Sequence, residues 1–425
     1  MTLTEFILQH ENDDTSALLL ARHRFPDIDI DLAVTTIECR RRLRRKVPSW
    51  YAEPALLYPS RLAAEQCSSE ETALLKARVA LSVAAEGRRI ADLTGGMGVD
   101  SWAFSRVFGE VLYNEMQPAL AEATKENFAR LGVTNVQFRC RQLVAGDSTD
   151  GCASLPANAG NLLDLLDGFR PDMIYMDPAR RAEDGRKVFR LADCRPDVLA
   201  LLPELFAACP KILLKLSPMA DITQLSRELP DLRAVTVVGA DGECKELLLA
   251  LERGYAGPYT LTVCEKGAVL AFEADDRCPI GSGMTKHNAG TTTETSWPTV
   301  SGQLLFEPGK ALAKAGVFRQ IGARFGLSPI GASTHLYTAE SIPEELQPFG
   351  KVFEIEEVLP LNNETFRSLR RRIPSAEITA RNLPLTSDAL RKKLGIVSGG
   401  TQHLFGVRSD ASGNLLLVTT PVFCK

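Results

Sequence analysis

The stretch Ala91-Asp92-Leu93-Thr94-Gly95-Gly96-Met97-Gly98, residues 91–98, decides the fold because it places three glycines between an apolar run and a helical pattern. Apolar residues at helical spacing resume at Val99-Asp100-Ser101-Trp102-Ala103-Phe104, which predicts a strand, a tight turn and a helix. Glycines let the backbone approach a ligand, and a helix N-terminus offers free N–H groups. We therefore expect a nucleotide or nucleoside cofactor here, although a plain turn that ends a strand is the alternative.

Two further apolar runs end in acidic residues. The run 110–116 predicts a second strand with Glu115 at its tip, where a carboxylate can accept hydrogen bonds from both ribose hydroxyls. A third run, 171–176, leads into Asp177-Pro178-Ala179-Arg180. Since the tips of parallel strands share one edge of a sheet, these residues are expected to line one ligand site.

In this order the motifs resemble the class I S-adenosylmethionine-dependent methyltransferases, over about residues 85–252. The resemblance implies a Rossmann-like α/β domain with a mostly parallel seven-stranded sheet, and S-adenosylmethionine as cofactor. The cofactor residues that it implies are Asp92, Thr94, Gly95, Gly96, Gly98, Asp100, Glu115, Met116 and Asp177. The catalytic residues that it implies are Asp177, Pro178 and Arg180.

Two departures from the family pattern bear on the cofactor turn and the acceptor. Thr94 stands where the family usually has its first glycine, and the loop 177–180 lacks the aromatic residue that amino-methylating members stack on a flipped base. The loop is similar to that of RNA uracil-C5 methyltransferases, but the fifth strand, 211–215, runs into Leu216-Ser217-Pro218 without a cysteine. Covalent C5 chemistry needs that thiolate, so direct displacement is expected.

A nicotinamide dehydrogenase is the competing interpretation of a glycine turn followed by an acidic strand tip. The turn is not a clean G-x-G-x-x-G, and a reductase has no need of the loop 177–180. The runs 232–238 and 247–251 predict two strands joined by a short connection. An antiparallel pair that closes a parallel sheet resembles the methyltransferases.

In the expected mechanism, the methyl acceptor binds at Asp177, whose carboxylate would accept a hydrogen bond from the nucleophile or take its proton. Arg180 and Arg181 would bind substrate phosphates through their guanidinium forks. The alternative for both arginines is a salt bridge with Glu183 or Asp184. Most of the catalytic gain would come from bringing methyl donor and acceptor together.

Composition describes an ordinary globular protein of 425 residues, with 45% hydrophobic and 24% charged residues and a formal net charge of −4. No apolar stretch of about twenty residues exists, and the first residues lack the basic start of a signal peptide. A cytoplasmic location is expected. The 10 cysteines include no C-x-x-C pair, so neither a disulfide framework nor a metal site is predicted.

Two segments are locally basic despite the negative net charge. Residues 40–46 form a dense run that is either a nucleic-acid surface or a solvated helix end. In the segment 364–393, basic residues outnumber acidic ones; they are Arg367, Arg370, Arg371, Arg372, Arg381, Arg391, Lys392 and Lys393. The residues expected to bind RNA phosphates are Arg180, Arg181, Arg371, Arg372, Arg381 and Lys392.

The chain is expected to comprise an N-terminal helical region (1–80), the methyltransferase domain (81–253), an α+β connecting domain with a possible ferredoxin-like fold (254–345) and a C-terminal domain (346–425). Helices are predicted over 17–24, 31–46 and 70–85, and over 305–325 with Pro308 in the first turn. Ser69 carries a helix N-cap signal. Gln66 and Ser69 are secondary cofactor candidates, and Gln142 and Asp147 are alternatives for the adenine contact.

The motifs of the last segment, Arg381-Asn382-Leu383-Pro384-Leu385, Arg391-Lys392-Lys393-Leu394 and Gly399-Gly400, resemble the THUMP-like domain behind such methyltransferases in bacteria. True THUMP domains bind structured RNA, so the resemblance implies RNA by analogy of fold. The predicted function is methylation of rRNA or tRNA without a covalent cysteine intermediate. The alternatives are an RNA-binding protein with a vestigial methyltransferase fold, and a methyltransferase of a protein or small molecule.

Overall fold

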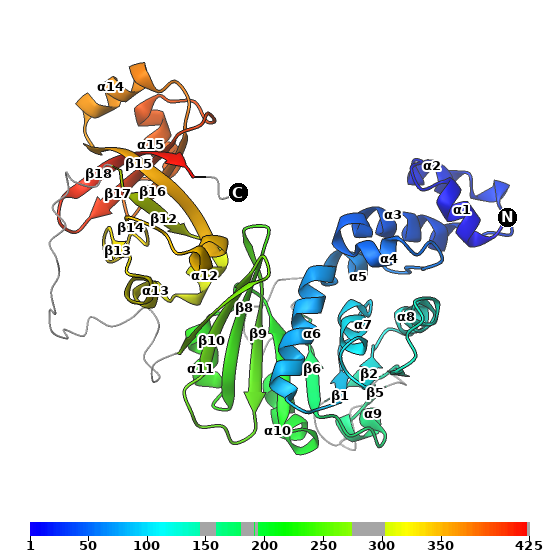
Figure 1. Cartoon of the computed structure of the whole chain (residues 1–425). Coiled ribbons are helices and arrows are strands. Elements are labelled where there is room, and N and C mark those ends of the chain that lie inside the picture. The colour runs from blue at the N-terminus through cyan, green and yellow to red at the C-terminus, as the bar shows by residue number, and fades with distance from the viewer. Residues whose placement is uncertain (145–158, 180–190, 192–193, 274–301, 423–425) are drawn as a thin grey trace. The chain divides into compact units, whose positions relative to one another are not determined.

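The computed structural model describes residues 1–144, 159–179, 191, 194–273 and 302–422 (Figure 1). Their contacts divide the chain into two compact units. The first comprises Met1–Val235 and Glu246–Tyr259, and the second comprises Thr236–Lys245 and Thr260–Lys425. The four predicted segments stay a prediction. Among the helices that the described residues form, none has the length and apolar character needed to cross a membrane.

The first unit begins with a run of helices that includes the predicted ones, and side chains cap the N-termini of most of them. Ser69 accepts a hydrogen bond from the Thr72 N–H at the start of α6, which confirms its cap signal. Trp50, fully buried, packs edge-on against Trp102 and Phe128 and so fastens these helices to the following domain. The helices are α1 (Leu3–Gln9), α2 (Thr15–Leu20), η1 (Arg22–Arg24), α3 (Ile30–Lys46), α4 (Pro48–Tyr51), α5 (Arg61–Gln66) and α6 (Glu70–Ala84).

A mixed sheet follows, with the strand order β11-β10-β8-β9-β7-β6-β1-β2-β3. Strand β1 is parallel to β2 and β6, and β7 is antiparallel to β9. This confirms the α/β fold class and the antiparallel closing pair, while the hairpin β10–β11 extends the sheet beyond the seven strands expected. The strands are β1 (Arg89–Asp92), β2 (Glu110–Asn114), β3 (Val136–Arg139), β6 (Met173–Met176), β7 (Lys211–Leu216), β8 (Leu232–Ala240), β9 (Glu243–Glu252), β10 (Thr260–Glu265) and β11 (Ala268–Glu273).

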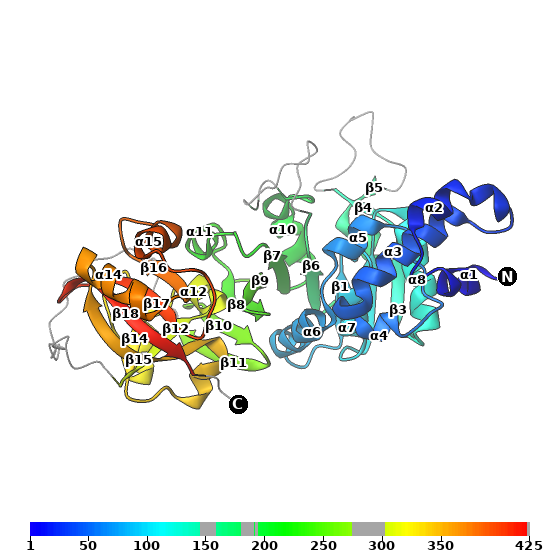
Figure 2. The same ribbon diagram turned by 90° about the horizontal axis from the view of Figure 1, so that it is seen from above.

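Helices cover both faces of the parallel part of this sheet, with α6 and α7 on one face and α10 on the other (Figure 2). Burial on both faces explains why the central strands are continuously apolar; all four residues of β6 are buried. The remaining elements of this unit are α7 (Val99–Ser105), α8 (Pro118–Arg130), β4 (Gln142–Leu143), β5 (Ala159–Gly160), α9 (Leu162–Leu166), α10 (Val198–Ala208) and α11 (Ile222–Glu228).

The second unit, to which the contacts also assign β10 and β11, contains a seven-stranded sheet in the order β13-β14-β12-β15-β18-β17-β16. Both faces of β18 are buried: Leu415 and Leu417 belong to one apolar cluster, and Leu416 and Val418 join α14 and α15 in another. The elements are β12 (Leu304–Pro308), α12 (Lys310–Ala315), α13 (Phe318–Phe325), β13 (Ser328–Pro329), β14 (Tyr337–Ala339), η3 (Glu344–Phe349), β15 (Gly350–Pro360), α14 (Asn363–Arg372), β16 (Glu377–Arg381), α15 (Ser387–Leu394), β17 (His403–Ser409) and β18 (Gly413–Pro421).

The helix expected over 305–325 is wrong at its start. Leu305 and Phe306 lie in β12, where they pair with β14 and β15 and are fully buried. Pro308 ends this strand instead of opening a helix, and α12 begins after Gly309. The helical part is also divided, because Gly316 takes the left-handed conformation (φ 71°) that ends α12.

Candidate active site

The glycines of the turn are required by space and by backbone conformation. A Cβ at Gly95 would lie 2.2 Å from the ring of Tyr113, and a Cβ at Gly98 would lie 2.6 Å from Thr124 Cγ2. Gly98 has φ 87° and forms the N-cap of α7. At Gly96 (φ 54°) a Cβ would meet only the Thr94 carbonyl at 4.0 Å, so the turn is open on that side. The turn is therefore closely packed against Tyr113 and Thr124 at Gly95 and Gly98, and it is accessible at Gly96.

Glu115 lies at the tip of β2 and reaches the same turn. Its Oε2 accepts a hydrogen bond from the Gly96 N–H at 2.9 Å, and its Oε1 accepts one from the Gln117 N–H at 2.9 Å. Burial raises the pKa of Glu115, although the backbone donors oppose that rise. The neighbouring Met116 is 53% exposed. A carboxylate acceptor and an accessible apolar side chain thus lie beside the glycine turn.

Asp92, the last residue of β1, is fully buried beneath the turn. Its Oδ2 accepts a hydrogen bond from Ser101 Oγ at 2.6 Å, and its Oδ1 accepts one from the Thr94 N–H at 3.1 Å. Burial raises the pKa of Asp92 to about 7. Both carboxyl oxygens therefore hold the turn to α7.

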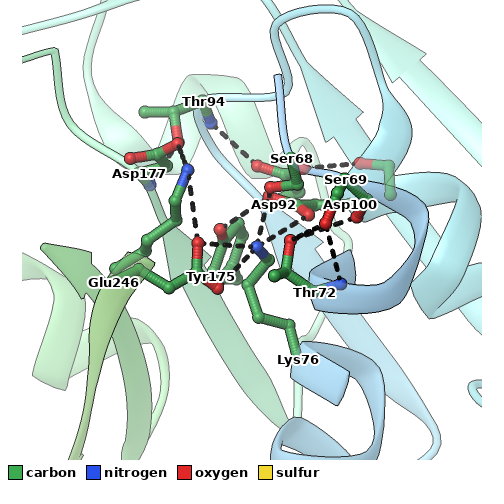
Figure 3. Close-up of polar contacts among 12 residues, drawn as sticks. Ser68, Ser69, Thr72, Lys76, Asp92, Thr94, Asp100, Tyr175, Asp177 and Glu246 are labelled. Atoms are coloured by element: carbon green, nitrogen blue, oxygen red, sulfur yellow. Dashed lines mark hydrogen bonds and ion pairs between the residues drawn. The ribbon is translucent and has the colours of Figure 1, made fainter. Parts of the chain in front are cut away.

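The loop that begins at Asp177 is fastened directly to the glycine turn. The Asp177 N–H donates a hydrogen bond to Thr94 Oγ1 at 2.6 Å (Figure 3). Pro178 is buried, and Ala179 forms an antiparallel bridge with Arg195. Arg180, Arg181 and their expected partners Glu183 and Asp184 lie outside the described residues. Thr94, the departure from the family pattern, thus supplies a hydroxyl that glycine cannot.

Beside Asp177, the structure adds a buried charge cluster that sequence reasoning missed. The cluster is defined here as Asp177, Lys215, Glu246, Lys76 and Asp100. The Lys215 ammonium donates to Asp177 Oδ2 and lies 3.9 Å from Glu246 Oε2. Lys76 Nζ is 2.8 Å from Glu246 Oε1 and 3.2 Å from Asp100 Oδ1 (Figure 3). For Lys215 a signal existed, since it is a cation inside the apolar run 212–216, whereas α6 also carries Glu70, Glu71 and Arg78, so Lys76 does not stand out there.

Asp100, an expected cofactor residue, faces this cluster. Its Oδ2 accepts hydrogen bonds from Ser68 Oγ at 3.0 Å and from the Tyr175 hydroxyl at 2.8 Å. Burial alone would raise the pKa of Asp100, but Lys76 and Lys215 lower it below its ordinary value. Contact of Asp100 with the cofactor stays a prediction.

The secondary cofactor candidates are spread along the chain. Gln66 is the last residue of α5, Ser69 caps α6, and Gln142 begins β4. Asp147 lies outside the described residues. Their contacts with the cofactor stay predictions. Within the described ranges, no three His, Cys, Asp or Glu side chains are grouped so that they could hold a metal ion.

The basic run 40–46 is largely used inside the protein. Arg40 is 3% exposed and donates to the carbonyls of Tyr51 and Glu53. Arg41 donates to two carbonyl oxygens, and Lys46 donates to the Ala64 and Glu65 carbonyls. The run is therefore neither a simple solvated helix end nor a continuous free surface.

The basic residues of the C-terminal segment fall into two groups. The first group makes internal contacts: Arg370 donates to the Leu394 and Lys393 carbonyls, Arg372 pairs with Glu357, Arg381 with Glu307, and Arg391 with Asp388. The second group is exposed on α14 and α15 and comprises Arg367, Arg371, Lys392 and Lys393. Arg372 and Arg381 are thus partly committed to partners within the chain.

Known proteins resemble the chain in both units. A solved structure from Porphyromonas gingivalis W83, named as a candidate methyltransferase, is 29% identical, with a TM-score of 0.78; the match covers 99% of this chain and 98% of that chain. Uncharacterized S-adenosylmethionine-dependent methyltransferases from two Mycobacterium tuberculosis strains are each 24% identical over 345 residues, which is 80% of this chain and 82% of theirs. Family models described as a ferredoxin-like domain and as THUMP domain-like match residues 304–346 and 350–421.

A Rossmann-like sheet, a glycine turn and an acidic tip on β2 define a class of enzyme, and the whole-chain likeness agrees with it. The chain is an S-adenosylmethionine-dependent methyltransferase with the class I fold. It carries a THUMP-like domain at its C-terminal end.

Proposed function

We propose that the enzyme methylates structured RNA, an rRNA or a tRNA, by direct transfer to a nucleophile held at Asp177. The observation that carries the direct route is the end of β7, where Lys215 is ion-paired with Asp177 and the following residues Leu216, Ser217 and Pro218 include no cysteine for a covalent mechanism. Rossmann-fold methyl transfer without a thiolate depends on positioning donor and acceptor together. A cytoplasmic location stays part of this proposal.

The residues at the turn fit the cofactor that the family uses. The open side of Gly96 leaves room for a ligand, and Glu115 offers carboxylate oxygens for ribose hydroxyls. The exposed Met116 offers an apolar surface for a flat base. S-adenosylmethionine supplies an electrophilic methyl group when it is bound. Gly95, Gly96, Gly98, Glu115 and Met116 are the residues that we propose hold it.

Cys67, which follows α5, does not supply the nucleophile for a covalent mechanism. The Cys67 thiol donates to the Ala64 carbonyl at 3.3 Å, and burial raises its pKa above the ordinary value. A protonated thiol is a poor nucleophile, because the thiolate is the reactive form. Cys67 therefore does not support a covalent intermediate.

RNA is supported by the C-terminal part of the chain. Its family-model match is to a THUMP-like domain, and THUMP domains bind structured RNA. Arg367, Arg371, Lys392 and Lys393 are exposed there on α14 and α15. Neutralising phosphates with such side chains releases counterions, which supplies affinity that falls as salt rises. A local basic surface agrees with RNA binding by a chain whose net charge is negative.

The test is transfer of tritiated methyl from S-adenosylmethionine into total RNA from a strain that lacks the gene. Wild-type protein should label RNA, and Asp177→Asn should label it at least about 100-fold more slowly, while binding of S-adenosylhomocysteine is retained. A protein extract and a small-molecule extract run in parallel. Label in either extract instead of RNA would favour another acceptor, and tight cofactor binding without any label would favour a binding role.

A further inference from the structure

The charge cluster links the acceptor loop to the helix that follows the cofactor turn. Asp177 follows β6, Lys215 lies in β7, Glu246 in β9, Lys76 in α6, and Asp100 in the first turn of α7. Adjacent members are joined by ion pairs, and all five belong to the first compact unit. The cluster thus runs without a gap from one side of the proposed site to the other.

Because these charged side chains are buried, each of them needs its ion-pair partner. The side chains of Lys215 and Glu246 are each 5% exposed, and that of Lys76 is fully buried. An unpaired charge in such surroundings is strongly destabilising, so each member depends on its neighbour. Asp177 is the most accessible member, at 26% exposure.

Lys215 remains an ammonium ion in this position. Burial alone would lower the pKa of Lys215, but the carboxylates of Asp177, Glu246 and Asp100 raise it above the usual range. A permanently protonated lysine neither attacks a methyl group nor takes a proton. It can, however, hold a carboxylate in one orientation.

We propose that Lys215 is a positioning residue for methyl transfer, which fixes the Asp177 carboxylate toward the acceptor while Glu246, itself paired with Lys76, holds Lys215 in place. Asp177 is then held at two points, with its backbone N–H on Thr94 Oγ1 and its Oδ2 on the Lys215 ammonium. With one oxygen fixed, the carboxylate presents the other to an acceptor that carries an N–H or O–H group. The activity arm below rests on the proposed function; the binding and spectroscopic arms do not.

The first test is spectroscopic and uses the full-length protein labelled with 15N-lysine. Buried, ion-paired ammonium groups are shielded from water, so Lys215 should give a resolved side-chain ammonium signal that is identified by its loss in Lys215→Arg. Asp177→Asn and Glu246→Gln should each shift that signal, whereas Lys211→Met, at the other end of β7, should leave it in place. An Asp177→Asn spectrum in which the Lys215 signal has not moved would overturn the proposed contact.

The second test compares rate with binding. Lys215→Met should lower kcat about 100-fold on the RNA fraction that wild type labels, with KM for that RNA and Kd for S-adenosylhomocysteine within about threefold of wild type. Lys211→Met should match wild type, and Lys215→Arg, which keeps the charge, should recover at least about tenfold over Lys215→Met. Should Lys215→Met not fold, Lys215→Arg and Asp177→Asn still provide the comparison.

The outcomes separate the two proposals. If wild type labels no RNA, the RNA assignment fails, while the ammonium spectrum still tests the position of Lys215. If wild type labels RNA and Lys215→Met does so at the same kcat, the positioning role is wrong. Equal losses of kcat and of S-adenosylhomocysteine binding would also overturn it, because they would indicate a general structural role.

Discussion

At the residue scale, Thr94 explains how a departure from a family pattern can be functional. Its N–H holds Asp92, and its hydroxyl holds the Asp177 N–H. The same residue therefore connects the glycine turn with the loop that begins at Asp177. The sequence identified the position as unusual, but the contact depends on β1 and β6 being neighbours in the sheet.

Thr94→Val keeps the shape of the side chain and removes its acceptor. We expect the free energy of unfolding to fall by about 1 to 2 kcal/mol, because the Asp177 N–H loses its partner. Methyl transfer should fall about tenfold, with S-adenosylhomocysteine affinity little changed. Urea unfolding, calorimetry and the labelling assay measure these changes. Thr94→Ser is the matched control, and an equally impaired Ser variant would contradict the role of the hydroxyl.

Gly95 tests whether the turn is fixed by packing. A Cβ there would overlap the Tyr113 ring, so Gly95→Ala should destabilise the protein by about 1 to 3 kcal/mol and weaken S-adenosylhomocysteine binding at least about tenfold. Thermal unfolding and titration calorimetry would show both effects. Gly109→Ala is the control, since its Cβ would lie 3.5 Å from the nearest atom. Equal stability of the two variants would contradict the packing argument.

Asp92 should make stability depend on pH. Its folded-state pKa is raised to about 7 by burial, so the folded protein binds more protons than the unfolded chain between about pH 4 and pH 7, and Asp92 costs stability as the pH rises through that range. Asp92→Asn does not ionise. We therefore expect its free energy of unfolding, relative to wild type, to rise by about 2.6 kcal/mol from pH 5 to pH 8. Urea unfolding at each pH measures this difference, and a constant difference would show that Asp92 does not titrate there.

At the element scale, the meeting of the glycine turn, Glu115 and Asp177 at one edge of the sheet could be predicted because its signals are local. A glycine turn, an acidic tip and the loop 177–180 each follow a short apolar run, and parallel strands bring such ends together. The buried charge cluster could not be predicted in the same way. Lys76 and Glu246 are far apart along the chain, and their contact depends on the packing of α6 against the sheet.

The start of the predicted helix at Leu305 failed for a related reason. Two apolar residues followed by Pro308 fit either a strand end or the first turn of a helix. The structure forms the strand because β14 and β15 supply its hydrogen-bonding partners. Pairing with distant segments overrides an ambiguous local pattern.

The exposed faces of α14 and α15 should provide phosphate contacts. Arg371→Glu combined with Lys392→Glu is expected to weaken RNA binding at least about tenfold near 100 mM salt and to reduce its salt dependence. Filter binding or fluorescence anisotropy across a salt series would measure both quantities. Arg45→Glu, an exposed residue at the end of α3, is the control. If Arg45→Glu weakened RNA binding more than the double variant does, the RNA-binding surface would instead lie on the N-terminal helices.

At the scale of the whole molecule, the two family-model matches in the second unit share one sheet. Strand β12 lies in the ferredoxin-like match and β15 in the THUMP-like match, and the two strands pair over five residues. The predicted boundary between residues 345 and 346 therefore passes through a single hydrogen-bonded structure. The similarity of each segment to a separate family could not reveal this continuity.

A fragment of residues 302–425 should consequently be more soluble and better folded than a fragment of residues 346–425. The shorter one leaves the edge of β15 without β12 and exposes hydrogen-bonding groups that favour association. Size-exclusion chromatography and hydrogen exchange would compare the two fragments. Equal solubility and protection would show that β12 contributes little to this sheet.

The division into compact units has a further consequence for how such a protein can change in evolution. The chain passes between its units at residues 235/236, 245/246 and 259/260, so the turn of the hairpin β8–β9 is grouped with the C-terminal part. No single break in the gene would release either unit whole. Recombination that exchanged the C-terminal part would therefore also have to exchange the tip of the hairpin β8–β9. We expect that the two units were more often inherited together than exchanged separately between proteins.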